Sequence, residues 1–227
     1  EPNRNSDATK LYMSASGQSI DNSIYVMDII DLAYSNVFGI EKIYKSFITM
    51  MNGVVADGKI KSWIPFPYDW RMSVSDIVYG QTKLSTTSIS LIDTLVKLSS
   101  DSLTGKVTLI AHSNGGLVAK QLVKALNEIG KGEIIDRVIT IGTPDLGAPQ
   151  AIPAILHGYK QSILAGFVLF ENVARNLSKN SLGALGLLPS RSFFDRASTS
   201  VIVDEYSATP KKINTYDKLF DFLTNNS

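Results

Sequence analysis

The sequence contains no cysteine and only two histidines, His112 and His157. The lack of cysteine excludes disulfides, thiolate metal sites and a cysteine nucleophile. The formal net charge of +1 provides no basic stripe for phosphate contacts, so no nucleic-acid partner is expected. No run of about 18 apolar residues is present, so no membrane-spanning helix is predicted. The polar stretch from Glu1 to Lys10 lacks the apolar core of a signal peptide.

The overall composition is typical of a folded globular protein. Hydrophobic residues make up 44% of the sequence and charged residues 19%. A chain of 227 residues is long enough for one substantial core, or for one core with an inserted cap.

Up to Pro149, apolar runs of β type alternate with segments of helical periodicity. Apolar residues at helical spacing predict helices over 40–52, 88–98 and 115–129. Strands are predicted over 60–64, 107–111 and 138–141, and residues 23–30 are interpreted as a strand or the wall of a cleft. The uncharged run 107–111 suits a strand buried on both faces of a parallel sheet. The alternation predicts an α/β fold with a mostly parallel, doubly wound sheet.

After Pro149 the pattern changes. Residues 151–189 are rich in Leu, Ile, Ala and Gly and include the apolar run Ser162 to Phe170, which we interpret as part of an inserted helical lid. Beyond Phe193, short β-prone pieces such as 200–203 alternate with turns, and a closing helix is predicted over 213–223. The sequence thus divides into three parts, namely a core (1–150), a lid (151–199) and a return segment (200–227).

The stretch from Val107 to Leu117 (VTLIAHSNGGL) carries the strongest chemical signal. A buried strand ends in a glycine-rich turn, and a helix follows. This context predicts a nucleophile elbow of the G-x-S-x-G type, with Ala111 in place of the first glycine and Ser113 as the nucleophile. Ala111 and Gly115 are expected to be small because the strand and helix crowd together there. The alternative is a serine in an ordinary glycine-rich turn.

An elbow at Ser113 would favour nucleophilic catalysis in three ways. It lifts the hydroxyl clear of the sheet, and it places that hydroxyl at the positive end of the following helix. It also aims the backbone N–H of Asn114 at the oxyanion of a tetrahedral intermediate, where one such donor is worth roughly 3–4 kcal/mol. His112 precedes the nucleophile, so we expect it to be a packed, hydrogen-bonded histidine that points away from the hydroxyl.

Four motifs occur in a recognisable order from about Ile24 to Phe222. They are PFPYDWR (65–71), the elbow AHSNGG, IGTPDLGAPQA (141–151) and LLPSRSFF (187–194). In this combination the chain resembles the lecithin:cholesterol acyltransferase-like lipases. The resemblance implies an α/β-hydrolase fold and a serine-dependent lipid ester hydrolase or acyltransferase that works through an acyl-enzyme on Ser113. It implies no metal and no organic cofactor.

The resemblance also suggests roles for residues outside the elbow. It places Asp69 and Arg71 near the mouth of the active site, whereas the alternative is a structural Asp69–Arg71 pair with Tyr68 and Trp70 packed under the sheet. Residues 142–149 would shape the turn into the lid. Asp145 is assigned to the mouth of the site, although most relatives carry histidine at that position.

The catalytic acid and base are harder to place. Relatives have a Pro-Gly oxyanion loop ahead of the first helix, which residues 1–24 lack, and their acid and histidine follow the equivalent of Leu223. Asp204 follows a short strand, but its segment resembles the family's pre-acid region. Either this is an internal piece of a longer enzyme, or Asp145 and His157 form an unusual triad. We expect the first, with little turnover by the piece alone, because an unactivated serine is a poor nucleophile.

The apolar lid predicts a lipid or other ester substrate, bound at a membrane or lipid surface. The alternative is that these residues simply pack on the core. A secreted or membrane-peripheral location is favoured. Two other functions remain open, namely a small-ester or lipid-anchor deacylase and a non-catalytic lipid-binding module that retains the fold.

Overall fold

The computed structural model describes residues 8–29, 32–35, 39–159, 163–164, 167–168, 171–197, 199–204 and 211–225. Helices and strands are mixed along this chain, as the α/β prediction requires. Up to the second parallel strand, the elements are η1 (Thr9–Leu11), β1 (Leu32–Ser35), β2 (Gly39–Lys42), α2 (Lys45–Ala56), α3 (Val74–Tyr79), β3 (Gln81–Lys83), β4 (Ser88–Ser90), α4 (Leu91–Asp101), β5 (Val107–His112), α5 (Asn114–Glu128), η2 (Gly132–Ile134) and β6 (Ile135–Ile141).

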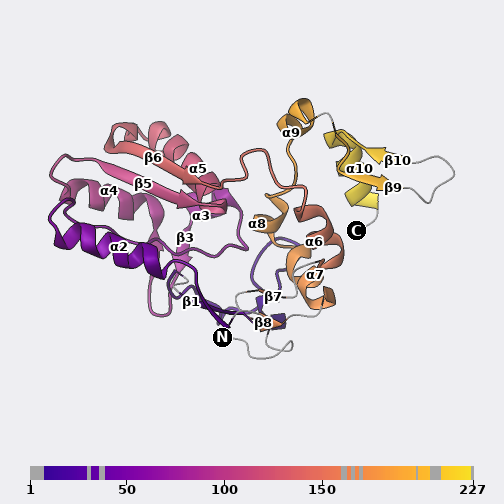
Figure 1. Cartoon of the computed structure of the whole chain (residues 1–227), viewed down its shortest axis with the longest axis horizontal. Helices are drawn as coiled ribbons and strands as arrows, with labels where there is room; N and C mark the ends of the chain where they lie inside the picture. The colour runs from indigo at the N-terminus through magenta and orange to yellow at the C-terminus, as the bar shows by residue number, and fades with distance from the viewer. Residues whose placement is uncertain are drawn as a thin grey trace.

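The remaining elements form the other side of the molecule (Figure 1). They are α6 (Ala151–His157), β7 (Ile163–Leu164), β8 (Phe167–Val168), α7 (Glu171–Lys179), α8 (Leu182–Leu185), α9 (Arg191–Arg196), β9 (Ile202–Asp204), β10 (Lys211–Ile213) and α10 (Tyr216–Asn225).

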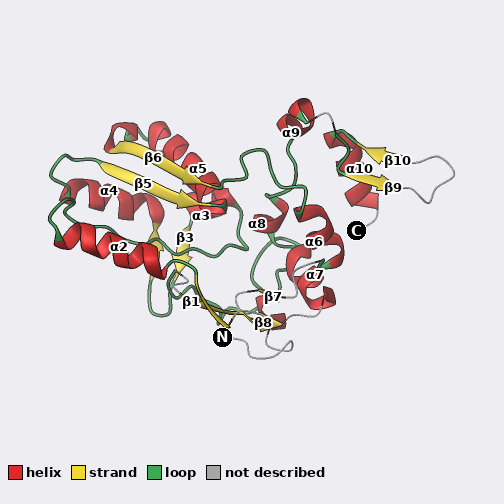
Figure 2. Ribbon diagram, in the orientation of Figure 1, coloured by secondary structure: helices red, strands yellow, loops and turns green. Residues whose placement is uncertain are grey.

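The centre of the first part is a β5–α5–β6 unit, in which the two strands run parallel (Figure 2). Their register aligns Thr108 with Arg137 and His112 with Ile141. The strand predicted over 107–111 and the helix predicted over 115–129 are confirmed. The strand predicted over 138–141 is confirmed and begins earlier, at Ile135.

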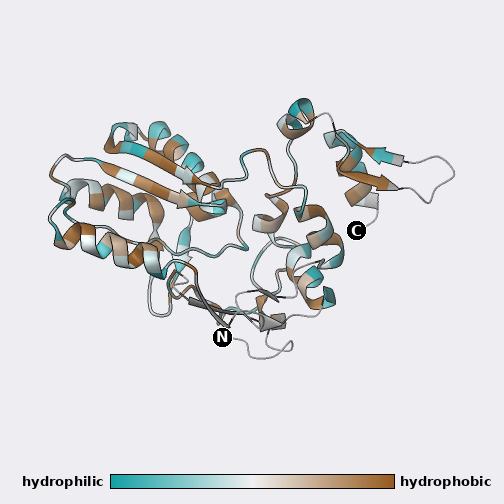
Figure 3. Cartoon of the chain, in the orientation of Figure 1, coloured by the Kyte–Doolittle hydropathy of each residue, from teal (hydrophilic) through white to brown (hydrophobic). Residues whose placement is uncertain are grey.

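Strand β5 is buried on one face only. Val107 and Ala111 are buried, and they alternate with exposed residues along the strand. On the open face, Ile110 is 43% exposed and its register partner Ile139 is 45% exposed. The prediction of burial on both faces is therefore wrong for the described residues. The strands nevertheless keep the apolar character that suggested it (Figure 3).

The buried face of β5 packs against three helices. Their side chains gather into one hydrophobic cluster from α3, α4, α5 and β5, with members Ile77, Val78, Leu91, Leu95, Val107, Val118, Leu122, Ala125 and Leu126. Leu122 and Leu126 of α5 are fully buried. Burial of a leucine side chain contributes about 1.5–3 kcal/mol, so this cluster fixes α5 against the sheet.

The wider doubly wound sheet is absent from the described residues. There β5–β6 is the parallel pair, and the other sheets are two-stranded and antiparallel: β1–β2, β3–β4, β7–β8 and β9–β10.

Two predicted helices have different starts in the structure. The helix expected over 40–52 is α2 and begins at Lys45, because residues 40–42 belong to β2. The helix expected over 88–98 is α4 and begins at Leu91, because Ser90 caps it. The Ser90 side chain accepts a hydrogen bond from the N–H of Asp93 at 3.2 Å, as is usual for an N-cap serine.

Two predicted strands near the start of the chain are not found. Residues 60–64 form a bend and irregular backbone. Pro65 and Pro67 follow directly, and proline cannot donate to a strand ladder. Residues 23–29 begin in a turn and are otherwise irregular. Their backbone hydrogen bonds run from the N–H of Ile24 to the carbonyl of Asp21 (3.3 Å) and from the N–H of Val26 to the carbonyl of Lys83 (2.8 Å). Ile30 lies outside the described residues.

The region expected to form a lid contains helices α6, α7, α8 and α9 and the short antiparallel pair β7–β8. The apolar run Ser162–Phe170 lies largely outside the described residues. The predicted β-prone piece 200–203 corresponds to β9, and the closing helix is α10, which begins at Tyr216 because Ile213 ends β10. No helix in the described part of the chain is long and apolar enough to cross a membrane.

Arg71 links three distant parts of the chain. Its residue is 2% exposed, and its guanidinium forms an ion pair with Asp69 at 2.6 Å. The same guanidinium donates to the carbonyl of Leu11 at 2.9 Å. The backbone carbonyl of Arg71 accepts hydrogen bonds from the Ser181 hydroxyl (3.2 Å) and from the N–H of Gly183 (3.0 Å). Arg71 therefore holds the N-terminal segment and α8 against the loop that precedes α3.

Replacement of this arginine is predicted to destabilise the protein strongly. Arg71→Met leaves the Asp69 carboxylate without its cation, and removal of one partner of a buried pair costs about 3 kcal/mol or more. Urea denaturation of the variant should show this loss in the free energy of unfolding.

The matched control is Arg191→Met. Arg191 forms a similar two-pronged contact with Asp217, but that pair is exposed. The free energy of unfolding should stay nearly unchanged in this variant, because exposed ion pairs contribute little. Equal losses in the two variants would contradict the linking role of Arg71.

Candidate functional site

The turn between β5 and α5 has an unusual backbone conformation at Ser113. Its φ is 53° and its ψ is −126°, and among the described residues it is the one non-glycine residue with positive φ. Such a conformation costs an L-amino acid about 1–3 kcal/mol and persists only where the surroundings enforce it. Strain of this kind is concentrated at functional sites.

Two backbone hydrogen bonds enforce the turn. The N–H of Ser113 donates to the carbonyl of Ile141, the last residue of β6, at 2.8 Å. The N–H of Gly116 donates to the carbonyl of Ser113 at 3.0 Å. The strained residue is thus tied both to the neighbouring strand and to the first turn of α5.

Ser113 is exposed, and its side chain does not cap the helix that it precedes. The hydroxyl is therefore not engaged by the first turn of α5. Asn114 is the first residue of this 15-residue helix, and the first N–H groups of a helix have no intrahelical partner. The helix dipole and the free N–H groups together favour negative charge beside Ser113.

Of the two glycines in the first turn of α5, Gly116 makes the closer approach to its surroundings, not Gly115 as expected. A Cβ on Gly116 would lie 1.9 Å from Oγ1 of Thr143, whereas a Cβ on Gly115 would make ordinary contacts of 3.7 Å or more. Thr143 follows β6, and its Oγ1 is buried without a hydrogen-bond partner. The small residue that the turn requires is therefore the third after Ser113.

Two tyrosines contact the residues on either side of Ser113. The Tyr44 hydroxyl lies 2.8 Å from Nδ1 of His112, and the two rings meet edge to face. His112 is thus hydrogen-bonded as expected, although it is exposed rather than packed in a core. The Tyr68 hydroxyl lies 3.7 Å from the position that a Cβ on Gly115 would occupy, and burial raises the pKa of Tyr68.

The other predicted site residues make contacts away from the Ser113 hydroxyl. Asp69 pairs with Arg71, which is the contact expected of a structural pair. Asp145 pairs with Lys120 of α5 at 2.6 Å. His157 ends α6 and is exposed. No hydrogen bond joins Ser113, Asp145 and His157, all of which are described, so the structure does not bring these three together as a triad.

The sequence motifs contact one another around these loops. The N–H of Ala148 donates to the carbonyl of Leu187 at 2.7 Å, and the N–H of Ser190 donates to the carbonyl of Leu146 at 2.9 Å. A Cβ on Gly147, where φ is 87°, would lie 2.3 Å from the Leu188 carbonyl oxygen. Residues 141–151 and 187–194 therefore form one unit of backbone contacts.

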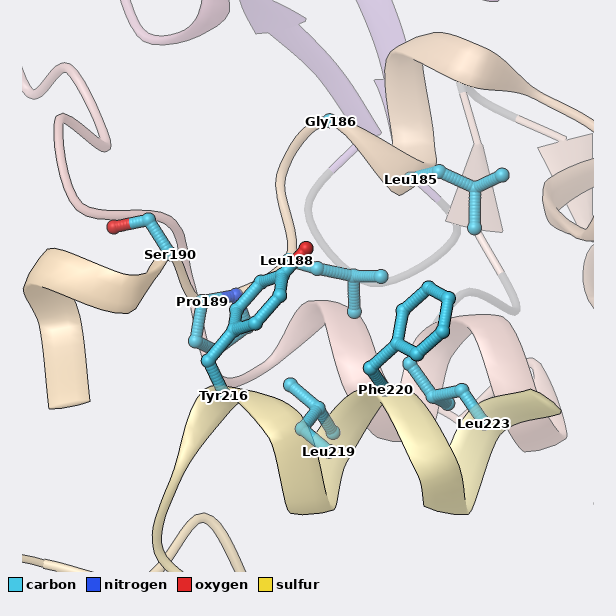
Figure 4. A pocket seen from close by; sticks show the side chains of 9 residues that line it. All are labelled: Leu185, Gly186, Leu188, Pro189, Ser190, Tyr216, Leu219, Phe220 and Leu223. Carbon is cyan, nitrogen blue, oxygen red and sulfur yellow. The ribbon is translucent and has the colours of Figure 1, made fainter. Parts of the chain in front are cut away.

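A separate apolar pocket of about 280 Å³ lies between the α8 region and α10 (Figure 4). Helix α10 contributes Tyr216, Leu219, Phe220 and Leu223, and the opposite wall consists of residues 185–190. Ser113 does not line this pocket. The hollow is suited to an aliphatic chain because aliphatic and aromatic side chains dominate its wall.

Sequence reasoning missed the contact of Tyr44 with His112 and the contact of Gly116 with Thr143. Tyr44 is distant in the sequence, and only the tertiary fold places it beside His112. Gly116 carried a usable signal, since the motif has two consecutive glycines and one of them had to meet the neighbouring loop.

A strand, a strained serine and a helix in this order define a protein of the mixed α/β class with the geometry of a nucleophile elbow. The family profile described as lecithin:cholesterol acyltransferase matches residues 20–227, and the chain belongs to this family. Membership implies the α/β-hydrolase fold and acyltransferase- or lipase-type activity on lipid substrates. Comparisons with curated proteins and with solved structures give no match.

The contact at Gly116 leads to a prediction about stability. Gly116→Ala should lower the free energy of unfolding by about 1–3 kcal/mol, because the new methyl group overpacks the Thr143 side chain. Thermal or urea denaturation measures the change. Addition of Thr143→Ala should recover part of the loss.

Gly115→Ala is the control for the same turn of helix. This variant should not lower the free energy of unfolding, because the new methyl group has room and alanine is a better helix former than glycine. A Gly116→Ala variant as stable as the Gly115→Ala variant would disprove the close approach.

Proposed function

We propose that Ser113 is the nucleophile of a lipid ester hydrolase or acyltransferase that works through an acyl-enzyme. The supporting observation is the positive φ of Ser113 at the junction of β5 and α5. Hydrogen bonds hold this residue in a strained conformation, and such strain is concentrated at functional sites. The class of reaction is inferred from the family, and the choice of Ser113 is inferred from the geometry of the turn.

In this mechanism the Ser113 oxygen attacks the carbonyl carbon of the ester, and its proton passes to a general base. The oxyanion accepts a hydrogen bond from the backbone N–H of Asn114 beside the positive end of α5. Collapse of the intermediate breaks the bond to the alcohol oxygen, which takes up the proton held by the base, and leaves an acyl group on Ser113. Water or a second alcohol then accepts the acyl group.

The acid and base are proposed to come from residues outside this chain. The chain has two histidines; His112 is engaged by Tyr44, and His157 has no hydrogen bond to Ser113 or Asp145. Asp145 is occupied by Lys120. We assign Asp145 to the rim of the site, because it follows Thr143, which contacts the first turn of α5. Asp69 and Arg71 shape that rim through the loop that carries Tyr68.

A lipid substrate, met at a membrane or lipid surface, is favoured by the family and by the apolar pocket beside α10. A non-catalytic lipid-binding module is the second candidate, and the lack of a hydrogen-bonded triad among Ser113, Asp145 and His157 is the observation that favours it.

The nucleophile is tested by covalent labelling. In the protein at its full natural length, a fluorophosphonate probe should label Ser113, and Ser113→Ala should abolish both labelling and ester hydrolysis. Mass spectrometry of the labelled peptide identifies the site. Ser100→Ala is a suitable control, because Ser100 is exposed and its hydroxyl donates to the carbonyl of Lys97 at 2.7 Å. An unlabelled Ser113 would leave only the non-catalytic candidate.

The length of the acyl chain distinguishes a lipase from a small-ester or lipid-anchor deacylase. With nitrophenyl esters, kcat/KM should rise from acetate to laurate, because each buried methylene contributes up to about 0.8 kcal/mol. A preference for acetate would count against a long-chain substrate and favour the deacylase.

A further inference from the structure

On the basis of the function proposed above, we infer that Tyr44 and Tyr68 are positioning residues that hold the nucleophile turn from its two sides. Tyr44 contacts His112, directly before Ser113, and the Tyr68 hydroxyl lies against Gly115, two residues after it. Neither tyrosine is assigned to the reacting atoms.

The first side of the turn is the end of β5. Tyr44 immediately precedes α2, and its hydroxyl lies 2.8 Å from Nδ1 of His112. The ring centroids are 5.7 Å apart with an interplanar angle of 73°, an edge-to-face arrangement. His112 is the last residue of β5 and lies on the exposed side of the strand. Tyr44 therefore fixes a side chain that would otherwise be free to rotate in water.

The second side is the first turn of α5. The Tyr68 hydroxyl lies 3.7 Å from the position that a Cβ on Gly115, the second residue of α5, would occupy. Burial is the main cause of the raised pKa of Tyr68; the hydrogen bond from Asn114 opposes it, and the nearby Tyr44 adds to it.

The contacts of Tyr44 and Tyr68 restrict the movement of the strained turn at Ser113. The backbone of Ser113 is strained, and relaxation of the turn would rotate its hydroxyl away from the N–H of Asn114. A misplacement of about 1 Å in a reacting group can cost a factor of about 100 in rate. Side-chain contacts on both sides of the turn restrict that relaxation without blocking access to Ser113 itself.

The test compares Tyr→Phe variants, which remove one hydroxyl and keep the ring. In the protein at its full natural length, Tyr68→Phe and Tyr44→Phe should each lower kcat about threefold to tenfold, in line with the loss of one hydrogen bond. KM should stay unchanged, because neither phenol is proposed to bind substrate. Reversion of each variant to the native tyrosine should restore kcat.

Tyr79→Phe is the matched control. The Tyr79 hydroxyl donates to Glu128 at 2.6 Å, at the opposite end of the same helix α5. Its loss should leave kcat unchanged. A general effect of α5 stability on activity would instead lower kcat in all three variants and would overturn the positioning role.

Two further measurements do not depend on turnover. Amide hydrogen exchange over residues 112–116 should accelerate in Tyr68→Phe at unchanged global stability, and the ring ¹⁵N shifts of His112 should change in Tyr44→Phe. Unchanged exchange and shifts would overturn the inference even with an active enzyme. Altered exchange and shifts with an unchanged kcat would also overturn the inference, because the contacts would then not affect the reaction. If wild-type Ser113 is neither labelled nor active, the proposed function fails first, and the positioning role fails with it.

Discussion

The hydrogen bond from the N–H of Ser113 to the carbonyl of Ile141 is the constraint on which the site depends. It joins the last residue of β6 to the residue that follows β5, so the parallel pairing of the strands continues into the turn. Without this bond, a serine with φ of 53° would relax toward an ordinary backbone conformation. The hydrophobic cluster beneath β5 holds α5 in place, and the hydrogen bond to Ile141 fixes the position of Ser113 relative to both strands.

Around this bond, loops from separate parts of the sequence meet. Thr143 packs on Gly116, Tyr68 packs on the first turn of α5, and a Cβ on Gly183 would lie 1.9 Å from the carbonyl oxygen of Trp70. The four motifs that suggested the family are therefore linked through space by direct contacts or through α8. Their order along the sequence reflects a single structural unit rather than four independent signals.

The sequence predicted the parts of this unit in which local pattern and tertiary structure agree. The run 107–111 and the helical stripe of 115–129 are strong local signals, and the serine between them could be identified as a candidate. Composition alone predicts a strand over residues 60–64. In the structure Pro65 and Pro67 follow this segment, and it pairs with no strand among the described residues, so its β propensity is not realised. The apolar strand was predicted to be buried on both faces because composition does not show how many helices cover a sheet.

Contacts between distant residues could not be predicted by the same means. Lys120 on α5 neutralises Asp145, and no spacing rule indicates that pairing. The contact of Tyr44 with His112 spans 68 positions and depends on the path of the chain between them. The proposed nucleophile Ser113 could thus be identified from the sequence, whereas the residues that surround it could be identified only from the fold.

The position of Arg71 has a consequence for how the protein folds. Its hydrogen bonds reach Leu11, 60 positions earlier, and Ser181, 110 positions later. Closure of such long loops has an entropic cost before the contacts form, and proteins dominated by distant contacts fold slowly. The β5–α5–β6 unit relies on nearer contacts and can assemble first. The loop that carries Tyr68 would then reach its final place late, so the strained turn at Ser113 would form before its surroundings are complete.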